Sequence, residues 1–86
     1  MTVTALSAAG SVVIRSARRS DGAALHRLAS LDSARIPVGE LLVAETDGSL
    51  VAAHAPASGA TIADPFRHTA EVVDLLHLRG TLLRAA

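Results

Sequence analysis

The residues best suited to bind a ligand form one short run, Arg67-His68-Thr69, at the expected start of the last helix. The first turn of a helix has free N–H groups and the positive end of the helix dipole, and a guanidinium offers a planar fork for a phosphate. This run could therefore hold an anion. The commoner alternative is that Asp64 or Thr69 caps the helix while Arg67 points into water.

Four histidines raise the question of a metal site: His26, His54, His68 and His77. Their separations along the chain are 28, 14 and 9 residues. None of these spacings places two imidazoles at i, i+4 on a helix or at alternate positions of a strand. The sequence therefore predicts no metal site, and we expect surface or partly buried histidines.

Catalytic constellations are not evident. The chain has no cysteine and no G-x-S-x-G run, and Ser58-Gly59 falls in an expected turn. Glu45 and Asp47 flank an expected hairpin tip, where carboxylates are ordinarily solvated. The sequence thus predicts no catalytic and no cofactor-binding residue.

Arg79 falls near the centre of the apolar stripe of the last helix. The leading interpretation is an arginine that buries its stem and pairs with a carboxylate. A second is that the helix ends there, with Gly80 as its cap and Arg79 near the last carbonyls. Anion binding is the third.

Composition excludes several classes of protein. The 86 residues are 50% hydrophobic and 19% charged, with eight arginines balanced by eight acidic residues and with Phe66 as the single aromatic. Such a chain is one small ordered domain with no disulfides, and its zero net charge disfavours nucleic acid and anionic lipid as partners. No run is long and apolar enough for a membrane span, so we expect no membrane association and a cytoplasmic location.

The beginning of the chain is rich in Ala, Ser, Thr and Gly and has no Lys or Arg before Arg15. It lacks the positive n-region and continuous apolar core of a secretory signal. We therefore expect a flexible tail over residues 1–11 and a single domain over residues 12–86.

Strands and helices are indicated by local patterns. Residues 11–15 are a β-branched run, and Ser20 is a suitable N-cap for an amphipathic helix with Asp21 in its first turn. Asp47-Gly48 accepts the positive φ angles of a tight hairpin between residues 40–46 and 49–55.

A third short strand at residues 60–63 and a helix beginning between Pro65 and Thr69 complete the order β-α-β-β-β-α. The predicted fold class is α+β, with a three- to four-stranded, mostly antiparallel sheet and two packing helices.

Several of these runs resemble GNAT-type N-acetyltransferases. Residues 13–17 followed by Ser20-Asp21 resemble the first strand and helix of that family, residues 42–52 resemble its second and third strands, and residues 62–65 lie where it has a fourth strand and a proline-containing turn. The chain is also similar to short bacterial proteins that carry the run Ala-Asp-Pro-Phe.

The resemblance implies the N-terminal half of the GNAT fold, without its glycine-rich acyl-CoA loop. The glycines of that loop would fall near Glu71 and Val73, where side chains would crowd the phosphates. The chain also ends before the second half of the acyl-CoA cleft.

Two functional hypotheses follow from these departures. The first is a non-catalytic binding or assembly module, a homodimer or a partner-bound protein, because the missing half would expose a strand edge. The alternative is a minimal acyl-CoA-dependent N-acyltransferase completed by dimerisation or by a partner, with acetyl-CoA held by Arg67 and His68.

Overall fold

The computed structural model describes residues 3–7 and 10–85 of the chain. They form a five-stranded antiparallel sheet whose strand order follows the chain, together with two helices, as the α+β prediction required. The elements are β1 (Val3–Ser7), β2 (Gly10–Ser16), α1 (Gly22–Leu31), β3 (Leu42–Thr46), β4 (Ser49–His54), β5 (Thr61–Ala63) and α2 (Ala70–Ala85), with a 3-10 turn at Arg19–Asp21 before α1.

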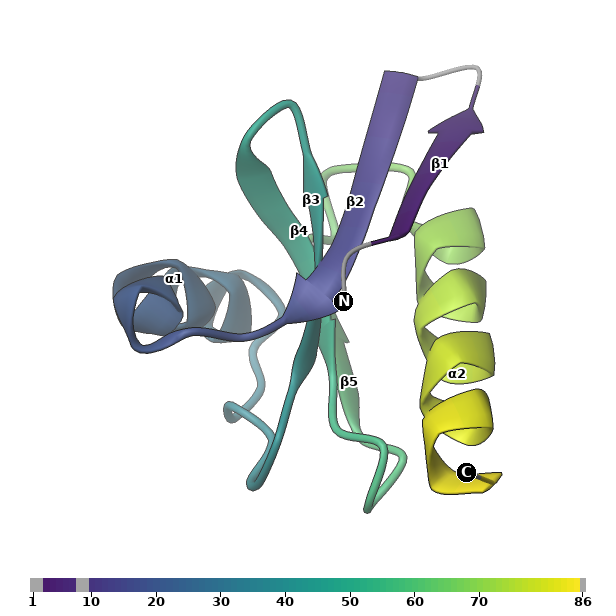
Figure 1. The fold of residues 1–86 in the computed structure, drawn as a ribbon. Coiled ribbons are helices and arrows are strands. Elements are labelled where there is room, and N and C mark those ends of the chain that lie inside the picture. Colours follow the sequence, from purple (N-terminus) through teal and green to yellow (C-terminus); the bar gives the residue numbers. More distant parts are fainter. Residues whose placement is uncertain (1–2, 8–9, 86) are drawn as a thin grey trace.

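The two helices cover opposite faces of the sheet, which Figure 1 shows nearly edge-on between them. Successive strand residues point to opposite faces, so Val43 of β3 packs toward α1 and Ala44 packs toward α2. The α1-side core contains Leu25, Leu28, Ala29, Val43, Leu50, Ala53 and Ile62; the α2-side core contains Val12, Ile14, Leu42, Ala44, Val51, Ala52, Val72 and Leu76. Burial on both faces explains why the central strands are continuous apolar runs.

The tail predicted for residues 1–11 is wrong for Val3–Ser7, which forms strand β1. It pairs antiparallel with β2, from Val3 opposite Ile14 to Ser7 opposite Gly10. Without it, β2 would present a row of unpaired N–H and C=O groups at the edge of the sheet. Composition cannot reveal that such an edge is there to be paired, and the sheet therefore has one strand more than expected.

The Asp47-Gly48 hairpin is confirmed. Asp47 and Gly48 have φ angles of 51° and 81°, as a tight turn with two left-handed residues requires. The register between β3 and β4 shifts next to Ala44, which leaves Val51 as an extra residue in β4. Because of this bulge, the consecutive residues Val51 and Ala52 both face the α2-side core, while Leu50 and Ala53 on either side face the α1-side core.

The start of α1 differs from the prediction that Ser20 is its cap. Ser20 lies in the 3-10 turn, and the carboxylate of Asp21 accepts a 2.6 Å hydrogen bond from the backbone N–H of Arg18. Asp21, and not Ser20, is therefore the N-cap residue of α1. Its carboxylate is also held by two hydrogen bonds from Arg15.

Helix α2 begins at Ala70 and continues through Gly80 to Ala85, so Gly80 is an interior residue and not a cap. A Cβ at Gly80 would lie 2.9 Å from Nε2 of His54 and 3.4 Å from Cβ of Pro56. The glycine thus allows α2 to approach the sheet closely beside His54.

Replacing Gly80 by alanine is expected to destabilise the domain by about 1 kcal/mol. The gain in helix propensity, ~1 kcal/mol, is smaller than the ~1–3 kcal/mol cost of overpacking against a buried ring. Gly22→Ala is a matched control, because nothing lies within 4 Å of the Cβ that it would add in α1. Urea unfolding measures both variants, and a Gly80→Ala protein as stable as Gly22→Ala would contradict the close approach.

Candidate functional site

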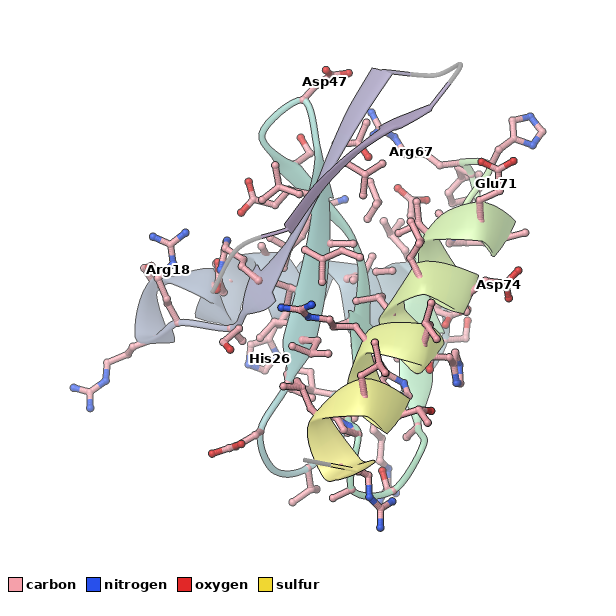
Figure 2. The ribbon with its side chains drawn as sticks, turned by 45° about the vertical axis from the view of Figure 1, so that its right-hand side comes forward. Arg18, His26, Asp47, Arg67, Glu71 and Asp74 are labelled. Atoms are coloured by element: carbon pink, nitrogen blue, oxygen red, sulfur yellow. The ribbon has the colours of Figure 1, made fainter. Side chains whose placement is uncertain are left out.

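The run Arg67-His68-Thr69 borders an open cavity of about 720 Å³ at the N-terminal end of α2. Its lining includes Asp32, Asp64, Arg67, His68, Thr69 and Glu71. Two smaller cavities of about 340 and 310 Å³ adjoin it, and Arg67 lines all three. Figure 2 shows Arg67 and Glu71 at the same end of the molecule.

The loop between β5 and α2 is shaped by Asp64. Its carboxylate Oδ1 accepts a 2.9 Å hydrogen bond from the N–H of Phe66, and its own N–H donates to the carbonyl of Val51 at 2.9 Å. Asp64 therefore closes a turn, and Thr69 holds the N-cap position of α2, where its carbonyl accepts from Val73 at 2.8 Å.

The charges around this cavity do not favour an anion. Three carboxylates, Asp32, Asp64 and Glu71, share the lining with Arg67 and His68. Glu71 lies in the first turn of α2, where its own charge already interacts with the positive end of the helix dipole. A phosphate placed here would meet more negative than positive charge.

Two of the four histidines are brought together at the contact between α2 and the sheet. Nδ1 of His54 lies 2.8 Å from Oγ1 of Thr61, and the same oxygen lies 3.1 Å from Nε2 of His77. The two imidazole centroids are 4.3 Å apart. Because a hydroxyl carries one proton, it donates to one ring and accepts from the other when both are neutral.

The sequence did not predict this cluster, because its residues are far apart along the chain. His54 is buried, whereas His77 is exposed, and so are the other two histidines, His26 and His68. Within residues 3–7 and 10–85, no three His, Asp or Glu side chains gather closely enough to hold a metal ion. The His54–Thr61–His77 cluster instead links β4, β5 and α2 by hydrogen bonds.

Protonation of His54 should destabilise the fold. Burial, and then the neighbouring His77, lower the pKa of His54 from its usual 6.5. The contribution to stability is complete above pH 6.5 and is lost as the pH falls below it, since the unfolded chain takes up the proton first. At pH 5.5 this lowers the ratio of folded to unfolded protein by at most about tenfold.

Urea unfolding at pH 7.5 and 5.5 measures this effect. The loss should shrink in His54→Gln, which keeps a hydrogen-bonding group beside Thr61, and persist in the exposed control His26→Gln. An identical loss in all three proteins would contradict the assignment.

A second cluster that sequence reasoning missed is the network of Arg15, Asp21 and Glu45. The guanidinium of Arg15 donates two 2.8 Å hydrogen bonds to the two carboxylate oxygens of Asp21 and a further one to Glu45. Bonds from Arg15, assisted by the N–H of Arg18, lower the pKa of Asp21 to about 2 although burial opposes this. The prediction that Glu45 is solvated at the hairpin tip is therefore wrong, whereas Asp47 is exposed there.

Arg79 does not form the ion pair that was the leading prediction. It is half-buried on α2, and within the described part of the chain no carboxylate lies within salt-bridge distance of it. The second interpretation is also wrong, because α2 continues beyond Gly80. The end of α2 is held instead by Arg84, which donates to the carbonyls of Pro56 and Ala57 at 3.1 and 3.2 Å.

Comparisons with protein-family models, with curated proteins and with solved structures found no match to this chain. None of the helices in the described residues has the length and apolar character needed to cross a bilayer.

Proposed function

We propose that this domain is a non-catalytic assembly module that self-associates through the outer face of α2. The observation that carries the proposal is a group of exposed leucines in the second half of α2: Leu78, Leu82 and Leu83 are 57%, 56% and 50% exposed. Clustered exposed apolar side chains mark interaction surfaces. In both figures no helix or strand of the described residues covers the side of α2 opposite the sheet.

The exposed edge of β5, which the sequence suggested as the assembly surface, is less suited to assembly than α2 is. The edge strand β5 has only three residues, and the N–H of Ala63 donates to Oδ2 of Asp32 at 3.1 Å. A short edge with an N–H already occupied by a side chain resists pairing with another strand. The helix surface is therefore the better candidate.

The GNAT-like frame remains a proposal, and a non-catalytic role suits it best. Where the resemblance places phosphate-binding glycines, this chain has Glu71 and Val73, and Glu71 lines the cavity. Backbone N–H groups can approach a pyrophosphate only where side chains leave room.

Self-association is tested by sedimentation velocity from a few to several hundred micromolar. We expect the average mass to rise toward that of two chains, and the rise to disappear in the double variant Leu78→Gln/Leu82→Gln. Val38→Gln is the control, because Val38 is 88% exposed but lies outside α2. A wild-type chain that stays monomeric throughout would contradict the proposal.

The alternative, an acyl-CoA-dependent N-acyltransferase, draws support from the 720 Å³ cavity beside Arg67 and Thr69. Its volume falls in the range of small-molecule sites. Calorimetric titration with coenzyme A and acetyl-CoA separates the two functions. We expect no binding heat at millimolar ligand; heat that is lost in Arg67→Gln would favour the enzyme.

A further inference from the structure

Three leucines of α2 follow a heptad pattern. Leu75, Leu78 and Leu82 follow one another in steps of three and four residues, which is the 3.5-residue repeat of a two-helix seam. Leu78 and Leu82 are exposed, whereas Leu75 is partly buried against the α2-side core. Val72, Leu76 and Gly80 are buried on the sheet side of the same helix. Helix α2 thus packs on its own sheet through Val72, Leu76 and Gly80 and leaves Leu78 and Leu82 exposed, with Leu75 at the boundary between the two faces.

The charged residues that flank this seam select an orientation. With Leu75 and Leu82 at a and Leu78 at d, Asp74 occupies a g position and Arg79 the following e position. In a parallel pair a g residue faces the e residue five positions further on in the other helix, and such pairs set partner and orientation. In an antiparallel pair g positions face g positions and e positions face e positions, so Asp74 could not meet Arg79 of the other helix.

Both flanking side chains are placed to take part. Asp74 is exposed and projects away from the sheet in Figure 2. Arg79 is bonded to no carboxylate of the described residues, so its guanidinium needs no rearrangement of an existing ion pair.

Resting on the proposed function, we propose that two copies of this chain pair α2 in parallel about a two-fold axis, with Leu75, Leu78 and Leu82 in the seam and with Asp74 of each copy bonded to Arg79 of the other. Asp74 and Arg79 then determine the specificity of the interface. A seam of three leucines buries less than the ~800 Å² per partner of a standard interface. We therefore expect a dimer with a Kd in the micromolar range.

Charge reversal tests the pairing. Asp74→Arg and Arg79→Asp each set like charges against each other twice, and we expect each to raise the Kd about tenfold or more. The double variant restores opposite charges with the signs exchanged and should return to within about threefold of the wild-type Kd. Sedimentation velocity gives the Kd values, and circular dichroism with urea unfolding checks that each variant is folded.

Orientation is tested separately with Glu71→Cys, because the chain has no cysteine of its own. Glu71 continues the seam register at the start of α2, so parallel helices bring the two cysteines together and oxidation should yield a disulfide-linked dimer. A dimer that depends on Leu78 and Leu82 but neither cross-links nor responds to charge reversal would overturn the parallel pairing and leave self-association standing. Absence of any leucine-dependent dimer would overturn the proposed function itself.

Discussion

Replacing Arg15 by methionine is expected to cost about 3–5 kcal/mol of the free energy of unfolding, the largest effect of any substitution proposed for this domain. The side chains of Arg15 and Asp21 are only 11% and 8% exposed, and Glu45 bonds the same guanidinium. Methionine keeps the length of the stem but leaves two carboxylates without their cation, one of them buried. A buried ion pair contributes little net stability, but removing one partner costs much more because it leaves an uncompensated buried charge.

Urea unfolding at pH 7 measures this cost, with Arg19→Met as the control. Arg19 is an exposed arginine of the neighbouring 3-10 turn, and its replacement should change stability by less than about 0.5 kcal/mol. Adding Asp21→Asn and Glu45→Gln to Arg15→Met removes the orphaned charges and should recover part of the loss. A loss below about 1 kcal/mol in Arg15→Met would show that the network contributes little.

The same network predicts that the domain loses stability at acidic pH. The pKa of Asp21 falls from 3.8 to about 2 on folding. Its contribution is therefore complete above pH 3.8 and is lost as the pH falls toward 2, an effect on the order of 2 kcal/mol. In Arg15→Met this loss of stability on acidification should become smaller or turn into a gain, because a buried carboxylate without its cation is easier to protonate.

Leu76→Ala is the second large effect, with an expected loss of about 2–5 kcal/mol. Leu76 is completely buried between α2 and the sheet, where it packs with Val12, Ile14 and Val51. The truncation leaves a cavity that the flat sheet surface cannot collapse to fill. The loss should be independent of protein concentration, since it arises within one chain.

Leu78→Ala is the matched control on the other face of α2. Leu78 is 57% exposed, so we expect its truncation to leave unfolding of the dilute monomer within about 0.5 kcal/mol of wild type while weakening self-association. Equal destabilisation by the two substitutions would contradict the division of α2 into a sheet-packing face and a free face.

This division follows from the two cores of the domain. Each face of the sheet is covered by one helix, and each helix completes a separate cluster of apolar side chains. Helix α1 is short, and its apolar residues are taken up by its core; α2 has 16 residues and more leucines than the sheet can bury. Its surplus apolar surface is what makes assembly the proposed function.

Local elements were predictable because their causes are local. The Asp47-Gly48 turn follows from two residues that tolerate positive φ, and α1 and α2 follow from apolar residues at helical spacing. The run Arg67-His68-Thr69 at the start of α2 was also placed correctly, since a proline and a following apolar stripe mark a helix start.

The functional surroundings of those elements were not predictable. Glu45 was expected in water, yet it meets Arg15, which lies 30 residues away along the chain. His54 and His77 meet only because α2 crosses the sheet at Gly80. The predicted tail contains β1, whose pairing with β2 depends on an edge that the rest of the sheet creates.

The sequence by itself determined the type and order of most elements and the two-faced pattern of α2, since propensity and periodicity act over a few residues. Only the tertiary structure decided which polar groups meet and which apolar face stays uncovered. Those outcomes depend on register and on the close approach of distant segments. The bulge at Val51 illustrates this, because it turns the consecutive side chains of Val51 and Ala52 toward the same core.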